Sequence, residues 1–138
     1  MKKKIKTPII ICSINRNHFS IIKNDKISKN FKIYFINKPT ELKKIIKIKI
    51  KYIFFIHWRW KVSDKILIKH ECICFHMTDL PFGRGGSPLQ NLIIRNIKKT
   101  KLSAFRMTNE LDAGPIYLKE TLDLKGSAGE IYTRATQQ

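Results

Sequence analysis

Short hydrophobic runs in the first half of the chain are separated by segments with a helical pattern. Residues 8–14 form a run rich in isoleucine, typical of a parallel strand buried on both faces. Two similar runs, 31–36 and 52–56, predict further strands, and a fourth is expected over 71–75. The first half therefore predicts buried strands spaced widely enough for helices to lie between them.

Helical patterns fill the intervals between these strands. Asn17 is placed to cap a helix that runs to about Asn24. In the segment 39–46, apolar residues recur at the i, i+3, i+4 spacing of a helical stripe, namely Leu42, Ile45 and Ile46. With a short helix before the fourth strand, the order β-α-β-α-β-α-β predicts an α/β fold with an open, mostly parallel sheet.

The second half changes character at residues 81–88, where glycine and proline predict a loop. A helix is expected from Pro88 to about Asn96, followed by strands over 101–108 and 116–124. Ser127 is expected to cap a last helix, inside which the chain stops. Because nothing follows to pack the apolar face of that helix, we expect one domain, residues 1–138, incomplete at its C-terminus or in need of a partner.

The composition supports a folded chain with an unusual charge. Hydrophobic residues make up 43% of the 138 residues, which argues against disorder, although the net charge is +18. The charge is uneven, because residues 1–70 hold 19 Lys and Arg against three acids, whereas residues 71–138 hold nine against seven. A nucleic-acid or anionic membrane partner would explain such an excess. We favour the explanation that the excess reflects drift toward AT-rich codons, since 22 of the 28 basic residues are Lys and 24 residues are Ile.

The cysteine count and the apolar runs predict a cytoplasmic protein outside the membrane. The three cysteines form an odd, sparse set. The lysine-rich residues 1–6 resemble the start of a signal peptide, but the apolar run that follows, 8–12, is too short for one. The longest other apolar run, 52–56, is far below the roughly 20 residues that span a bilayer.

The fourth predicted strand carries two histidines and two cysteines at alternating positions, which raises the question of zinc: His70, Cys72, Cys74 and His76. A strand spreads such residues over about 20 Å, whereas zinc needs its ligands around one point. We therefore expect no metal site. His76 is of more interest, because it stands where a buried strand meets a loop, the position of ligand sites in open α/β sheets.

Two motifs resemble those of the folate-dependent formyltransferases. The run 74–85 is similar to the signature Asn-x-His-x-Ser-Leu-Leu-Pro-x-x-Arg-Gly, with matching positions at His76, Leu80, Pro81, Arg84 and Gly85. The run 111–116 resembles the family's later Leu-Asp-x-Gly-x-Ile element. The two motifs stand in the family's order and at its spacing, and the resemblance covers about residues 50–138.

The resemblance implies a Rossmann-like catalytic domain with helices on both faces of the sheet and an Asn, His and Asp catalytic trio. His76 and Asp112 take the His and Asp positions. Cys74 stands in the Asn position, and a thiol is a weaker donor than an amide toward negative charge on a formyl oxygen. Thr78 and Asp79 are candidates to compensate in part. The expected formyl donor is 10-formyltetrahydrofolate.

The resemblance also assigns binding roles. The segment Trp58, Arg59 and Trp60 occupies the place that lines the pterin pocket in relatives, although ordinary burial of the tryptophans is an equal alternative. The loop residues Asn109, Glu110 and Leu111 are assigned to the same ligand. Arg84, Gly85 and Gly86 are candidates to hold an anionic part of the substrate, with loop bracing as the alternative for Arg84.

The leading hypothesis is formyl transfer to the primary amine of a nucleotide-linked amino sugar, with initiator tRNA as the second acceptor. A basic nucleic-acid-binding module is an alternative, supported by the charge of residues 1–70 but by no RNA- or DNA-binding motif. An inactive or partial remnant is another, since Cys74 departs from the motif. A homodimer is one assembly that we consider.

Overall fold

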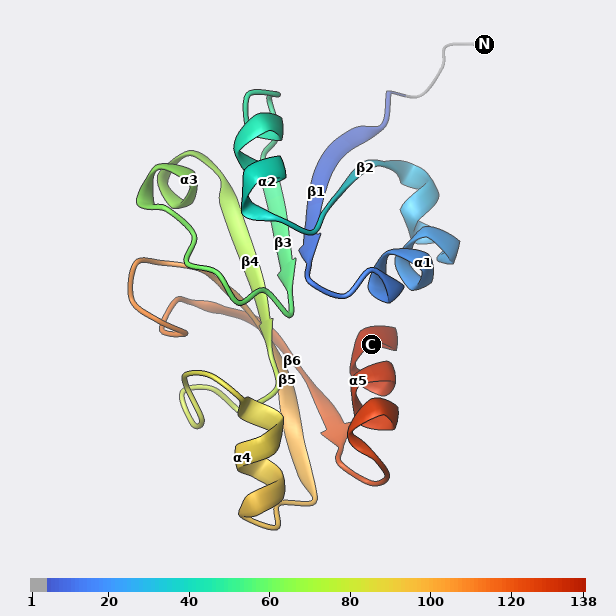
Figure 1. Cartoon of the computed structure of the whole chain (residues 1–138), viewed down its shortest axis with the longest axis vertical. Helices are drawn as coiled ribbons and strands as arrows, with labels where there is room; N and C mark the ends of the chain where they lie inside the picture. The colour runs from blue at the N-terminus through green and yellow to red at the C-terminus, as the bar shows by residue number, and fades with distance from the viewer. Residues whose placement is uncertain (1–4) are drawn as a thin grey trace. The chain divides into compact units, whose positions relative to one another are not determined.

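The computed structural model describes residues 5–138, so part of the lysine-rich start, residues 1–4, lies outside the described residues (Figure 1). The chain forms two compact units, one ending at Cys72 and the other spanning Ile73–Gln138. Each unit is described by itself below.

Parallel strands form the centre of the first unit. β1 (Thr7–Ser13) pairs in parallel with β2 (Phe31–Ile36) on one side and β3 (Tyr52–Ile56) on the other. The centre is apolar, since Ile10, Ile53 and Phe55 are fully buried. The runs read as strands in the sequence are thus confirmed as strands, because β-branched side chains fill both faces of such a sheet.

Four helical segments connect the strands of the first unit. They are α1 (Asn17–Asn24), the 3₁₀ turn η1 (Ile27–Asn30), α2 (Pro39–Ile45) and α3 (Asp64–Lys69). The expected Asn17 cap is wrong, because α1 begins after Arg16 and no side chain caps it. Instead, the Asn15 side-chain oxygen accepts the Asn17 backbone N–H at 3.0 Å, so the asparagine two residues earlier serves the entry to the helix.

Antiparallel pairing distinguishes the second unit. β4 (Glu71–His76), which begins in the first unit, pairs with β5 (Lys99–Arg106), and β5 pairs with β6 (Ile116–Asp123), both antiparallel. β5 begins two residues before the predicted strand, because Lys99 already pairs with Asp123. The helices of this unit are α4 (Pro88–Ile94) and α5 (Ala128–Gln137).

One apolar cluster holds the second unit together. It takes residues from the end of β4, from α4, from β5 and β6 and from α5: Met77, Leu89, Leu92, Leu102, Leu122, Leu124, Ile131 and Ala135. The apolar face of α5, expected to lack a packing partner, is therefore packed, with Ile131 fully buried. Ser127 caps α5 as predicted, and a capping box links it to Glu130.

The hydrogen-bonded strand order is β2-β1-β3-β4-β5-β6. The α/β, Rossmann-like class predicted from the sequence is confirmed, and the antiparallel β5–β6 pair is the part that the alternating pattern did not specify. Within residues 5–138, no helix is long and apolar enough to cross a membrane.

Candidate active site

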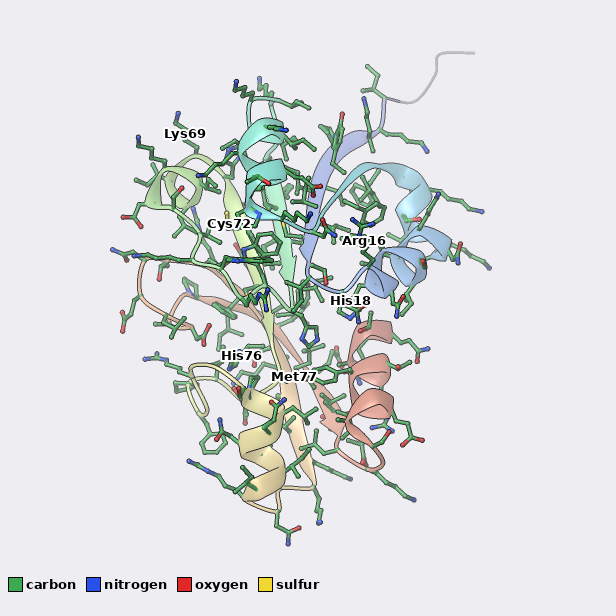
Figure 2. The ribbon with its side chains drawn as sticks, in the orientation of Figure 1. Arg16, His18, Lys69, Cys72, His76 and Met77 are labelled. Atoms are coloured by element: carbon green, nitrogen blue, oxygen red, sulfur yellow. The ribbon has the colours of Figure 1, made fainter. Side chains whose placement is uncertain are left out.

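The candidate site starts from His76, the last residue of β4. β4 leads from a buried segment into the loop, and His76 stands at the strand end with 8% of its surface exposed. Figure 2 labels this residue. Its Nε2 lies 2.8 Å from the Gly83 carbonyl oxygen. Because a carbonyl only accepts, Nε2 carries the hydrogen and donates it, which fixes the ring orientation.

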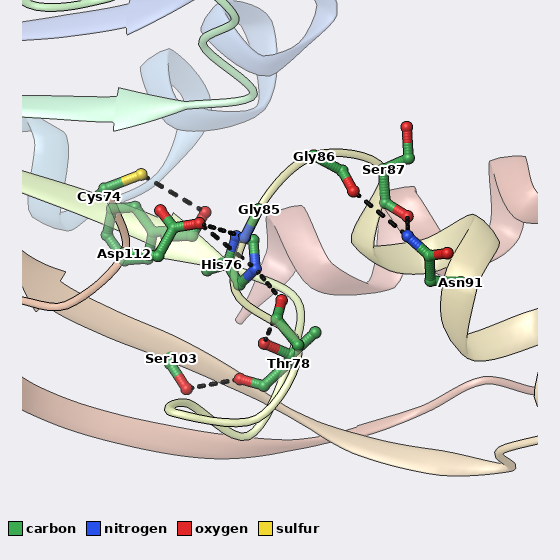
Figure 3. Close-up of polar contacts among 11 residues, drawn as sticks. Cys74, His76, Thr78, Gly85, Gly86, Ser87, Asn91, Ser103 and Asp112 are labelled. Carbon is green, nitrogen blue, oxygen red and sulfur yellow. Dashed lines mark hydrogen bonds and ion pairs between the residues drawn. The ribbon is translucent and has the colours of Figure 1, made fainter. Parts of the chain in front are cut away.

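Asp112 reaches the same place from the turn before β6. Its Oδ2 lies 3.9 Å from the His76 Nε2 and accepts the Gly85 backbone N–H at 2.8 Å (Figure 3). Its backbone is left-handed, with φ of 50°. Aspartate tolerates this conformation better than most residues. The structure therefore brings together the two residues that the motifs place 36 positions apart.

Cys74 completes the predicted trio on the same strand, two residues before His76, a spacing that puts both side chains on one face. Burial raises the pKa of its thiol to about 12, and the neighbouring Asp112 carboxylate adds to the shift. The group is therefore a neutral thiol at physiological pH. It offers a weak S–H donor and no nucleophilic thiolate.

A chain of hydrogen bonds behind His76 was not anticipated from the sequence. The Thr78 hydroxyl donates to the Gly83 carbonyl oxygen at 3.3 Å, so this oxygen accepts from both Thr78 and His76. The Thr78 carbonyl in turn accepts from the buried Ser103 hydroxyl at 2.7 Å. Gly83 suits this arrangement, because a Cβ on it would lie 2.6 Å from the Thr78 Cγ2.

The two residues considered as substitutes for the missing asparagine do not supply its hydrogen bond. Asp79 forms an ion pair with Lys119 at 2.6 Å, and a carboxylate cannot donate a hydrogen bond. The Thr78 hydroxyl is already used toward Gly83. Neither residue therefore supplements Cys74, which occupies the Asn position of the motif.

Of the loop residues predicted to bind substrate or cofactor, Gly85 contacts this centre directly. Gly85 donates its N–H to Asp112, and the Gly86 carbonyl accepts from the Asn91 amide at 3.3 Å. Arg84 lies 3.9 Å from the Glu110 carboxylate, and both side chains are largely exposed. Asn109 and Leu111 are exposed, and Leu111 has 70% of its surface accessible.

The three residues predicted to line a pterin pocket lie in the first unit, directly after β3. The Trp58 and Trp60 rings meet edge to face with centroids 4.8 Å apart, and Trp58 also contacts Phe55. The Arg59 guanidinium lies 4.9 Å from the centre of the Trp60 ring. These residues form a partly exposed aromatic cluster, and their role in binding stays a prediction.

The alternating histidines and cysteines do not gather around a point. The His70 Nδ1 lies 2.7 Å from the Ile50 carbonyl oxygen, at the other end of β4 from His76. Cys72 is buried, and Cys12, Cys72 and Cys74 are all free thiols. Among residues 5–138 no group of three or more His, Cys, Asp or Glu side chains is arranged to hold a metal ion.

Comparison with known proteins gives relatives of one kind, although no family model matches the chain. A methionyl-tRNA formyltransferase from Mycoplasma capricolum is 28% identical over 124 residues, which cover 86% of this chain and 39% of that protein. The solved methionyl-tRNA formyltransferase from Clostridium thermocellum superposes with a TM-score of 0.87 at 42% identity, covering 95% of this chain and 60% of that one.

A more distant structure shares the fold alone. The formyltransferase from Anoxybacillus kamchatkensis, solved with tetrahydrofolate and a UDP-linked formamido sugar, has a TM-score of 0.72 and 16% identity. The match covers 94% of this chain and 69% of that one. The chain spans less than two thirds of the length of the two methionyl-tRNA formyltransferases it matches.

Proposed function

We propose that this chain, which belongs to the folate-dependent formyltransferase family, transfers a formyl group from 10-formyltetrahydrofolate to a primary amine. The observation that carries the proposal is the His76–Asp112 pair, 3.9 Å apart and held by the loop that bears the family's first motif. Both residues stand at the positions that the family motifs assign to catalysis.

Formyl transfer asks little of the protein beyond placement and proton transfer. The neutral amine attacks the formyl carbon held next to it and forms a C–N bond, the bond from that carbon to N10 of the donor breaks, and tetrahydrofolate leaves. The proton that the amine loses balances the one that N10 takes up. His76 is placed to take that proton, because its ring is fixed through Gly83. The Asp112 carboxylate, 3.9 Å from Nε2, then stabilises the imidazolium that forms.

Cys74 sets the expected rate. Negative charge develops on the formyl oxygen during attack, and an amide donor at this position would stabilise it. Loss of one such donor costs on the order of 2.7–4 kcal/mol in comparable sites. We therefore propose a slow enzyme, in which the Cys74 thiol gives a weaker hydrogen bond than the asparagine of relatives.

The donor would supply the formyl carbon, and aromatic walls suit its flat pterin ring. Trp58 and Trp60 provide such walls in the first unit, with Arg59 beside them. The proposed stacking of the pterin ring on these residues depends on the aromatic faces of the cluster, which are partly exposed. We also propose a cytoplasmic setting, in keeping with free cysteines.

For the acceptor we propose the amino group of a methionyl-tRNA, which reverses the order favoured from the sequence. The Mycoplasma and Clostridium relatives carry that activity in their names, and the latter is 42% identical, whereas the sugar-bound structure is 16% identical. A nucleotide-linked amino sugar is the second candidate, because the sequence of residues 75–93 resembles that of the sugar-acting branch of the family.

The decisive experiment follows tetrahydrofolate release from 10-formyltetrahydrofolate in the presence of each acceptor. One arm contains methionyl initiator tRNA, another a UDP-linked 4-amino sugar, and a third contains no amine. Release that depends on one amine and disappears in His76→Gln supports the proposal and names the acceptor. Equal, background release in all arms for the purified wild-type chain would overturn the formyl-transfer proposal.

The Cys74→Asn variant tests whether the thiol limits the rate. Restoring an amide donor is expected to raise kcat by ten-fold or more if the thiol is the weak element, since each 1.4 kcal/mol is a factor of ten. Cys74→Ser is the matched control, because it replaces the thiol by a hydroxyl of similar size. An unchanged kcat in Cys74→Asn would show that this chain works equally well with a cysteine.

A further inference from the structure

A small pocket in the second unit lies between the segment 78–84 and α4. It is lined by loop residues and by one side of the helix, among them Thr78, Phe82, Gly83, Arg84, Asn91 and Arg95. Among these described residues two are arginines and none is acidic. The pocket therefore favours a negatively charged ligand on charge alone.

The two guanidinium groups come from different elements, and each has one partner in the structure. Arg95, at the end of α4, lies 5.8 Å from the centre of the Phe82 ring, a cation–π contact that orders its side chain. Arg84 belongs to the loop and has the Glu110 carboxylate at 3.9 Å. That pair is exposed, and exposed ion pairs contribute little to stability, so it leaves Arg84 available to a stronger anion.

Asn91 stiffens the wall between the two arginines. Its amide donates to the Gly86 carbonyl at 3.3 Å and to the Ser87 carbonyl at 3.0 Å. The loop is thereby tied to the helix on which Arg95 stands. A pocket whose charged groups are held before the ligand arrives loses less free energy when it binds.

The size of the pocket limits what enters it. Its volume is about 140 Å³, whereas pockets for whole small molecules have roughly 300–1,000 Å³. With about 30 Å³ for each water molecule, the space holds four or five waters, or one anionic group. Four oxygens around phosphorus can accept from two separate guanidinium groups at once, which a single planar carboxylate does less well.

We propose that this pocket holds a phosphate group of the acceptor substrate. The inference rests on the proposed formyl transfer and deepens it, because Thr78 and Gly83 line the pocket and also hold His76. A phosphate bound there places the acceptor close to the reacting residues. The phosphate can belong to the terminal nucleotide of an RNA or to the diphosphate of a nucleotide sugar, which share this chemistry.

The test is a binding measurement that does not depend on formyl transfer. The full chain, labelled with ¹⁵N, is titrated with inorganic phosphate, adenosine 5′-monophosphate, UDP-N-acetylglucosamine or tetrahydrofolate. The signals of Arg84, Arg95 and Asn91 are followed. We expect the phosphate-bearing probes to shift them, and the tighter binder of the two nucleotides identifies the source of the phosphate.

Arg95→Gln is expected to raise the dissociation constant of the bound nucleotide at least ten-fold, and Arg84→Gln to act in the same direction. Lys98→Gln removes one positive charge from an exposed residue just beyond α4 that does not line the pocket, and a change below two-fold is expected. Equal weakening by Arg95→Gln and Lys98→Gln would overturn the proposal. So would shifts caused by tetrahydrofolate but not by phosphate, which would assign the pocket to the carboxylates of the donor.

A protein that binds nucleotides through Arg95 but releases no tetrahydrofolate with any amine would retain the phosphate site and lose the proposed reaction. If instead the Arg95→Gln variant transfers the formyl group with an unchanged KM, the proposed reaction stands and the proposed phosphate site fails. The two proposals therefore fail separately.

Discussion

The two units of the chain divide charge and chemistry between them. The first carries the lysine excess, contains no glycine and is built from parallel strands. The second holds all six glycines, is nearly balanced in charge and contains the His76–Asp112 pair. The difference shows that net charge, the most conspicuous feature of the sequence, does not indicate where the candidate catalytic pair lies. The pair lies instead where a glycine-bearing loop and turn bring a histidine and an aspartate together.

Histidines show the same contrast at the level of single residues. In the first unit, the His18 Nδ1 lies 2.8 Å from the buried Ser13 hydroxyl, and the His18 and His57 rings are 5.1 Å apart. Burial lowers the pKa of both rings, that of His57 to about 4, where the charge of His18 contributes as well. These histidines are neutral at physiological pH, whereas His76 faces a carboxylate.

The largest expected effect tests whether the second unit contains the catalytic residues. Asp112→Asn keeps a residue that tolerates the left-handed backbone but removes the negative charge beside His76. We expect kcat for formyl transfer to fall by about 10²–10⁴-fold, with a change in the free energy of unfolding below about 1 kcal/mol. Asp79→Asn, which removes an exposed carboxylate of the same unit, is the control. Equal rates for the two variants would place the reaction elsewhere.

A pH titration of stability examines the first unit. The pKa of His57 is about 4 in the folded chain and about 6.5 in the unfolded one. The unfolded state therefore binds more protons between these values, and stability is lost as the pH falls from about 6.5 to 4. For this one group the loss amounts to at most about 3 kcal/mol.

His57→Asn removes the titrating ring and keeps a residue suited to a φ of 49°. Urea unfolding at pH 7.5, 6.0, 5.0 and 4.5 should give a shallower pH dependence for this variant than for wild type. Lys61→Gln, an exposed change in the same unit, should leave the dependence intact. Parallel curves for wild type and His57→Asn would contradict the buried, neutral state assigned to this ring.

The smallest effect concerns the hydrogen bonds behind His76. Thr78→Val keeps the shape of the side chain and removes the hydroxyl that donates to Gly83, whereas Thr78→Ser keeps the hydroxyl and removes the methyl group. Each change should lower the free energy of unfolding by about 1 kcal/mol. Only Thr78→Val should also slow formyl transfer, by several-fold, because only it releases the carbonyl that orients His76. Equal rates for both variants would reduce Thr78 to a packing role.

Much of the fold was predictable because strand and helix periods act over short distances. Residues 31–36 and 52–56 form strands with the predicted limits, and Ser127 caps its helix as expected. The 3₁₀ turn at 27–30 was not predicted, since its polar sequence has no apolar period. The limits of β5 depend on pairing with β6, which is set by contacts distant in the sequence.

The site was predictable only in part. Taken one at a time, His76 and Asp112 have ordinary explanations, as a strand end and a turn, and only the two motifs together brought them into one site. The Gly83 carbonyl was missed because backbone acceptors leave no signal in a sequence, and Thr78 was expected to compensate for Cys74 rather than to donate to Gly83. Arg95 was missed as well, since its approach to Phe82 depends on how α4 packs.

Gly83 and Gly114 bear on the history of the gene. A side chain on Gly114 would collide with the Arg106 carbonyl oxygen, and one on Gly83 would press against Thr78. Glycine codons begin with two guanines, so mutation pressure toward A and T removes them unless selection opposes it. In a chain so enriched in lysine and isoleucine, these two codons can therefore change only at a cost to the local backbone or to the packing of Thr78.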